Sequence, residues 1–234
     1  MNGEAGRSRY KIKRATPISF EEFEEMLQRC RSDKERGLLV LLFYTGARVS
    51  EVVGIKQTRY KVLSEKGKRL KASGLLPKDW IKTPESSGLW KWVTRKPQPG
   101  LLKEDFEIDR ERGVLSINFK PVKRGRRVAP VHLPLSLPHI QYIIQCVRKA
   151  KPGEQVWAWS RWKVWNFIKR VSGGRLYPHA FRFSRATQFA RNPTISTADM
   201  QFWFGWANAS TADRYIQPVR SSAKLIKALK EEVG

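Results

Sequence analysis

The sequence has 234 residues, of which 41% are hydrophobic, enough for one good-sized domain with a real core. Lysine and arginine number 46 against 21 acidic residues, and the net charge of +25 favours a polyanionic partner, nucleic acid before an anionic membrane surface. Neither an apolar run of about 18 residues nor a signal peptide is recognisable, which argues against a membrane span and secretion. The two cysteines, Cys30 and Cys146, indicate no disulfide framework and fit a reducing cytosol.

A basic arm or linker over residues 1–15 and then two helices are predicted for the N-terminal part of the chain. Ser19 and Glu22 have the spacing of a capping box, which predicts where the first helix begins. The second helix is strongly apolar and covers residues 34–53, with an interruption at residues 45–48.

Residues 56–103 differ in character, because they contain thirteen lysine or arginine residues against three acidic ones, with several prolines and glycines. Their periodicity is poor, so short elements and loops are expected. The next two apolar stretches, 114–119 and 128–133, flank a basic turn at residues 123–127 and predict an antiparallel hairpin.

The rest of the chain is predicted to be helical, starting with a helix from Pro138 to Ala150. Ser160 is expected to cap a helix over residues 161–171, with Trp162, Trp165 and Ile168 along one side. Further helices are expected over residues 179–191, 197–206, 210–217 and 221–232. The predicted fold class is therefore mainly α with a small antiparallel β-sheet.

Arg48 is the first candidate for chemistry, because an arginine within an apolar helix is costly unless it is paired or faces a ligand. Glu51, three residues further on, offers the alternative of a structural ion pair. His179 and Arg182 have an i, i+3 spacing on a predicted helix, so together they can grip one phosphate. The start of an ordinary surface helix is the alternative explanation for that pair.

Trp206 and Tyr215, nine residues apart, are the last candidates. A tyrosine is a weak nucleophile at neutral pH and needs cationic groups nearby to act as one. Each of these two aromatic residues, taken alone, is better explained as part of the core.

Taken in order, Thr45-Gly46-Ala47-Arg48 with Glu51, the basic hairpin, His179-x-x-Arg182, Gly205-Trp206 and Tyr215 resemble the tyrosine recombinase or integrase family. The resemblance covers roughly residues 16–220 and implies that family's catalytic-domain fold. It implies that Arg48 and Arg182 bind the scissile phosphate and that Tyr215 is the nucleophile. His179 would hydrogen-bond the phosphate and assist proton transfer.

The resemblance implies three supporting roles as well. Trp206 stands where most members have a second histidine, and its indole N–H can donate a hydrogen bond but cannot shuttle a proton. Glu51 would support the site. A lysine of the hairpin would protonate the leaving 5′-oxygen, and Lys123 is preferred for this role, with Lys120 as the alternative.

The activity implied is site-specific recombination of double-stranded DNA through a 3′-phosphotyrosine, with no metal, ATP or other cofactor. A tetramer assembled on DNA, a cytoplasmic location in a host cell and integration of a viral or plasmid genome are expected. Three alternatives stay open: a type IB topoisomerase, a non-catalytic DNA-binding relative, and a metal-dependent transposase or nuclease.

The sequence departs from the family in two places. Only about 15 residues precede the catalytic domain, where most members carry a DNA-clamping domain, so the chain is either a fragment or a minimal recombinase. The basic segment at about 57–100 is longer than typical connections and is either a tolerated surface insertion or a DNA contact. The C-terminal tail, residues 221–234, is expected to dock on a neighbouring protomer or on its own domain.

Overall fold

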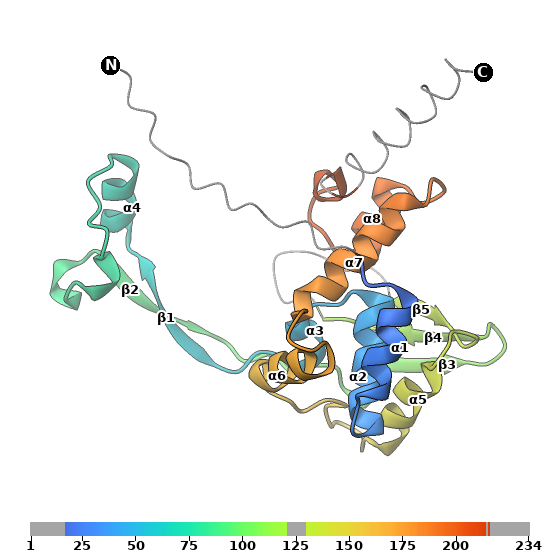
Figure 1. The fold of residues 1–234 in the computed structure, drawn as a ribbon. Helices are drawn as coiled ribbons and strands as arrows, with labels where there is room; N and C mark the ends of the chain where they lie inside the picture. Colours follow the sequence, from blue (N-terminus) through green and yellow to red (C-terminus); the bar gives the residue numbers. More distant parts are fainter. Residues whose placement is uncertain (1–16, 121–129, 214, 216–234) are drawn as a thin grey trace, which may run out of the picture. The chain divides into compact units, whose positions relative to one another are not determined.

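The computed structural model describes residues 17–120, 130–213 and 215, and within these residues the chain is mainly helical with small antiparallel sheets, as the sequence predicted (Figure 1). The helices are α1 (Phe20–Gln28), α2 (Asp33–Thr45), α3 (Val49–Val53), α4 (Glu65–Ala72), α5 (Ile140–Lys149), α6 (Arg161–Val171), α7 (Pro178–Arg191) and α8 (Thr197–Phe204). The strands are β1 (Thr58–Leu63), β2 (Trp90–Arg95), β3 (Phe106–Asp109), β4 (Val114–Ile117) and β5 (Val131–Pro134). No helix of the described part of the chain is long and apolar enough to cross a membrane.

Two compact units make up the fold. The segment Gly54–Pro99 forms the smaller unit, and the chain before and after it forms the larger one. In the larger unit the Leu101 amide donates to the Val52 carbonyl at 2.9 Å, so the chain resumes beside the end of α3.

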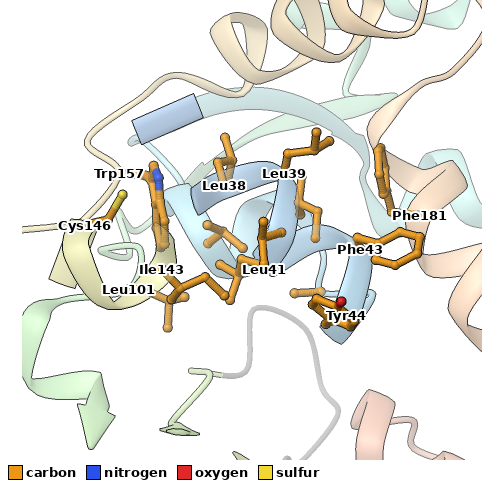
Figure 2. Close-up of a cluster of buried hydrophobic side chains, with 14 of the residues drawn as sticks. Leu38, Leu39, Leu41, Phe43, Tyr44, Leu101, Ile143, Cys146, Trp157 and Phe181 are labelled. Atoms are coloured by element: carbon orange, nitrogen blue, oxygen red, sulfur yellow. The ribbon is translucent and has the colours of Figure 1, made fainter. Parts of the chain in front are cut away.

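The core of the larger unit is built around α2, which is buried continuously from Gly37 to Thr45 (Figure 2). A helix that is apolar on all sides must be covered on all sides, and α2 contacts α1, α5 and α7. Gly37 allows α5 to approach closely, because a Cβ at this position would lie 2.8 Å from the Tyr142 carbonyl oxygen. The Trp157 indole closes the N-terminal end of α2 by donating to the Lys34 carbonyl at 3.0 Å.

The larger unit also contains an antiparallel sheet in the order β3-β4-β5. Strands β4 and β5 confirm the predicted hairpin, and its predicted basic turn, residues 123–127, lies outside the described residues. Strand β3 was not predicted, although its four residues, Phe106–Asp109, alternate between apolar and polar side chains.

Local signals placed several helix boundaries correctly. Ser19 and Glu22 form the expected capping box of α1, and Ser160 caps α6 by accepting from the Lys163 amide. The prediction that Trp162, Trp165 and Ile168 share one side of α6 was wrong, since Ile168 is buried whereas Trp162 is 70% exposed. Residues spaced by three drift around a helix, and the buried residues of α6 are Val164, Phe167, Ile168 and Val171, at spacings of three and four.

In the smaller unit, β1 and β2 pair antiparallel from Thr58↔Arg95 to Leu63↔Trp90 and are joined through α4 and short 3-10 turns. Short elements were expected in this segment, but a second antiparallel sheet was not. Its strands are rich in lysine, arginine and tryptophan, and basic residues obscure the alternation that marks a half-buried strand.

Candidate active site

Arg48 lies in the connection between α2 and α3, just before the first residue of α3, and not inside a helix as predicted. One oxygen of the Glu51 carboxylate accepts from the Arg48 backbone amide at 2.8 Å, and the other accepts from its Nη1 at 2.8 Å. The Glu51 side chain is 2% exposed and that of Arg48 27% exposed. The ion pair therefore exists, and it holds the guanidinium of Arg48 at the edge of the solvent.

Gly46 ends α2 in the left-handed conformation, at φ 59°. A Cβ at this position would lie 3.0 Å from the Phe204 ring and 3.3 Å from the Cα of Arg182. Glycine is therefore required at this position for two reasons: the left-handed backbone conformation and the close approach of α7.

The carbonyl groups at the C-terminal end of α2 receive hydrogen bonds from three distant side chains. Arg182 Nη1 donates to Gly46 at 3.1 Å, Trp203 Nε1 donates to Thr45 at 3.0 Å, and Arg185 donates twice to Phe43. These carbonyls lack partners within their own helix, and the negative end of the helix dipole favours cations. Two arginines of α7 thus cap α2, a role that the sequence did not reveal.

Arg182 is almost completely buried, at 2% exposure. Besides Gly46, its guanidinium donates to the Phe204 carbonyl at 2.7 Å. Its central carbon lies 4.8 Å from the centroid of the Phe204 ring and 5.8 Å from that of Trp206. Arg182 therefore joins the end of α2, the end of α8 and the indole of Trp206.

Trp206 stacks between two aromatic rings. Its ring centroid is 4.7 Å from that of Phe204 and 5.5 Å from that of Tyr215, and the Tyr215 ring is parallel to it within 4°. Trp206 is buried in a small cluster that includes Met200 and Phe204, with Tyr215 packed against it. Both residues are therefore packed aromatic residues, as the alternative interpretation expected. Only the Trp206 ring separates Tyr215 from the Arg182 guanidinium in this chain of contacts.

His179 is exposed at the start of α7 and shares a hollow of about 740 Å³ with Arg48. The hollow is lined by Ala47, Arg48, Val49, Ser50, Arg161, Trp162, Trp165, Tyr177, Pro178 and His179. The rings of Trp165 and Tyr177 stack in its wall, with their centroids 6.3 Å apart. Sequence reasoning gave these aromatic residues no functional role, although tryptophans interleaved with Arg161 and Lys163 were a usable signal.

Arg185 is the other residue that sequence reasoning missed. Its Nε and Nη2 both donate to the Phe43 carbonyl, at 3.1 and 2.8 Å, and its guanidinium lies over the rings of Phe43 and Tyr44. Burial lowers the pKa of Arg185 to about 10, which still leaves it charged at neutral pH. Its i+3 spacing from Arg182 was the available signal.

The predicted residues thus fall into two contact groups. Arg48, which is paired with Glu51, and His179 line the hollow. Arg182, Trp206 and Tyr215 form a chain of contacts, and Gly46, whose carbonyl accepts from Arg182, precedes Arg48 by two residues. Of the two candidate hairpin lysines, Lys120 pairs with Asp105 at 3.0 Å, and Lys123 lies outside the described residues. A different hollow, of about 540 Å³, lies near the N-terminal end of α2 and is lined by none of the predicted residues.

Comparison with known proteins finds similarity at the level of structure. No family model and no curated protein matches the sequence. Solved structures of the XerH site-specific recombinase match with 17% identity: a pre-cleavage complex with difH substrate (TM-score 0.54, 86% of this chain and 50% of that one) and a post-cleavage complex with palindromic difH (0.56, 92% and 53%). The XerA recombinase matches with 12% identity and a TM-score of 0.51, over 92% of this chain and 61% of that one. The chain therefore spans about half to three-fifths of the length of these recombinases, and the fold that it shares with them is that of the tyrosine recombinases.

Proposed function

We propose that this chain, which has a tyrosine recombinase fold, is a site-specific DNA recombinase that cleaves and rejoins DNA through a 3′-phosphotyrosine at Tyr215. The observation that carries the proposal is the contact chain from Arg182 through Trp206 to Tyr215, next to the hollow that holds Arg48 and His179. The likeness to solved recombinases at 12–17% identity supports the fold, and these residues support the chemistry.

Transfer of a phosphoryl group requires stabilised charge on the phosphate oxygens, a nucleophile in line and a proton for the leaving group. Arg48, His179 and the indole N–H of Trp206 are the proposed donors to the phosphate. Arg182 is proposed to bind the phosphate too, which requires it to exchange a carbonyl contact for a phosphate oxygen when DNA binds. This donor set supplies the positive charge that a metal provides in other phosphoryl-transfer enzymes.

In the proposed reaction the Tyr215 oxygen bonds to phosphorus and passes its proton to His179, which is proposed to assist proton transfer. The bond from phosphorus to the 5′-oxygen breaks, and the freed oxygen takes a proton from a hairpin lysine. Lys123 remains our preferred acid, with Lys120 as the alternative. Because Lys120 is already paired with Asp105, it would have to leave that carboxylate to act. Attack by the 5′-hydroxyl of a partner strand then restores the phosphodiester, so no ATP is consumed.

The decisive experiment uses a nicked suicide substrate that traps the covalent intermediate. The unchanged chain is expected to form a protein–DNA adduct, and Tyr215→Phe is expected to form none while it still binds the DNA. Persistence of the adduct in Tyr215→Phe would show that another residue is the nucleophile. Cleavage that leaves no adduct and stops on addition of a chelator would favour the metal-dependent alternative.

The partner in this proposal is double-stranded DNA, and strand exchange requires several protomers on it, with a tetramer as the expected assembly. A type IB topoisomerase shares the tyrosine chemistry but relaxes DNA as a monomer. Incubation with two-site plasmids separates the two activities: recombinant products support the recombinase, whereas relaxation without recombinants supports the topoisomerase.

A further inference from the structure

We propose that the smaller unit, Gly54–Pro99, is a second duplex-DNA-binding surface of this protein, and that its contacts are made by the exposed end of the β1–β2 ribbon. The proposal rests on the proposed function only in choosing DNA among polyanions. It gives the unit a binding role of its own, separate from the candidate active site.

Charge is the first argument. The unit carries twelve lysine and arginine residues against three acidic ones, an excess of nine within 46 residues. Two of the three acidic side chains are already paired within the unit, Glu65 with Lys68 and Asp79 with Lys82. Such a density of positive charge on a small unit costs self-repulsion, which a polyanion relieves.

One end of the ribbon is anchored by the rest of the unit. Trp90 is buried and donates from Nε1 to the Thr83 carbonyl at 2.9 Å, and Leu89 beside it is buried as well. Helix α4 packs directly on this backbone, since a Cβ on Gly67 would lie 2.2 Å from the Leu89 carbonyl oxygen. The anchored end therefore has a structural reason for its apolar residues.

The other end of the ribbon is exposed, although Trp92 also meets the buried Trp90 edge-on, with their ring centroids 5.6 Å apart. On one face Trp92 is 41% exposed, with the Arg59 guanidinium 5.2 Å and the Lys61 amine 5.5 Å from its ring centroid. Side chains alternate along a strand, and on the opposite face the Arg95 guanidinium lies 5.6 Å from the Tyr60 ring. Each exposed aromatic residue thus holds a cation in place by cation–π attraction.

A concave surface beside the ribbon adds to this charge. A hollow of about 830 Å³ in the unit is lined by Lys61, Val62, Leu63, Lys68, Lys71, Ala72, Trp80 and Lys91. Lys61 also donates to the Ile81 carbonyl at 2.8 Å, which fixes its position in the unit. Four lysines around one hollow are suited to contacting successive phosphates of a backbone.

Duplex DNA fits this surface best. A two-stranded β-ribbon is narrow enough to enter the major groove, which is about 12 Å wide. Cations on both faces of the ribbon would then meet the phosphates on both sides of the groove. An anionic membrane is the competing partner, because Leu75 and Ile81 are also exposed in this unit.

The test measures how salt weakens binding of the whole 234-residue chain to a labelled duplex, in a Tyr215→Phe background that is expected not to cleave. In this background Arg59→Gln with Arg95→Gln is expected to reduce the slope of log affinity against log salt by roughly 2, because each phosphate contact contributes about 0.9. The matched control, Arg110→Gln with Arg112→Gln, removes the same charge from exposed positions in the β3–β4 turn and is expected to leave the slope unchanged. Arg59→Lys with Arg95→Lys keeps the positive charge and is therefore expected to retain the salt slope of the Tyr215→Phe background.

An unchanged slope in the Arg59/Arg95 variant, or an equal change in the control, would overturn the proposal. The proposal would also be overturned if this variant no longer bound phosphatidylserine vesicles but kept the normal salt slope of DNA binding. That result would assign the surface to membranes. The covalent adduct, measured with Tyr215 intact, is independent of these results. If the chain with Tyr215 intact forms no adduct while the Arg59/Arg95 variant shows a reduced salt slope, only the proposed function is overturned. If the adduct forms normally and the salt slope is unchanged, only the proposed DNA-binding surface is overturned.

Discussion

The indole ring of Trp206 lies parallel to the phenol ring of Tyr215, with 5.5 Å between their centroids and 4° between their planes. Trp206 also contacts Arg182, since the central guanidinium carbon of Arg182 lies 5.8 Å from the centroid of the indole ring. Trp206 therefore has two separable properties, a flat surface that positions Tyr215 and an N–H that can donate to a phosphate oxygen.

Substitution separates these two properties. Trp206→Phe retains a ring to stack on Tyr215 but loses the N–H, so adduct formation is expected to fall by about 100-fold if the indole stabilises the phosphate. Rates of adduct formation on the suicide substrate measure this. A rate within a few-fold of the unchanged chain would limit Trp206 to packing. Trp206→Ala, the companion variant, is expected to lower stability by about 3 kcal/mol or more.

Gly46→Ala is expected to destabilise the larger unit and to reduce cleavage. The left-handed backbone at φ 59° costs a non-glycine residue about 1 kcal/mol, and the added methyl group meets the Phe204 ring at 3.0 Å. Urea denaturation measures the loss of stability. Gly173→Ala provides a control, since that glycine has the same φ of 59° but open space around it. Equal losses in the two variants would show that packing around Gly46 contributes nothing.

Glu51→Gln is expected to loosen Arg48 without removing it. The buried carboxylate accepts two hydrogen bonds from Arg48, and an amide can accept with one oxygen only. Adduct formation is expected to fall at least ten-fold, with a loss of stability of roughly 1 kcal/mol. Arg48→Lys is the companion variant, because it keeps the charge but not the planar fork. Full activity in both variants would exclude Arg48 from phosphate binding.

Trp162→Ser tests the hollow that holds Arg48 and His179. This side chain is largely exposed, so its replacement is expected to change the free energy of unfolding by less than about 0.5 kcal/mol. If the hollow binds DNA, affinity for a duplex is expected to fall several-fold, through loss of apolar contact. Phe202→Ser, an exposed aromatic residue on α8 that does not line the hollow, is the control. Equal affinities in the two variants would contradict the prediction.

Alkaline pH is expected to destabilise the fold through the two cysteines. Burial raises the pKa of Cys30 to about 12 and that of Cys146 to about 11. The folded chain therefore holds these thiol protons more tightly than the unfolded chain. The resulting stability is complete below the ordinary thiol pKa of about 9 and is lost as the pH rises towards the folded values, by at most about 1.4 kcal/mol per pH unit for each thiol.

Urea denaturation between pH 8 and pH 11 measures this loss. The double variant Cys30→Ala with Cys146→Ala is expected to show a flatter decline above pH 9 than the unchanged chain. Comparison of the slopes, and not of the absolute stabilities, removes the effect of the smaller side chains. Identical slopes would show that neither thiol contributes.

Much of the helical structure was predictable, because its signals are local. The capping box at Ser19, the cap at Ser160 and the apolar run of α2 each act within a few residues of the element that they define. The prediction that Trp162, Trp165 and Ile168 share one side of α6 was wrong, because which residues of this helix are buried depends on what packs against it. The ribbon of the smaller unit was missed for a similar reason, since its strands are paired across an intervening helix.

The sequence by itself determined which residues deserved attention: Arg48 with Glu51, His179 with Arg182, and Tyr215 nine residues after Trp206. Their order and spacing are properties of the chain, readable without a fold. Only the tertiary structure decided that Arg182 is buried and caps α2 through Gly46, a residue 136 positions away. The physical reason is that the carbonyls at the end of a helix need partners, and packing, not sequence distance, determines which side chain reaches them.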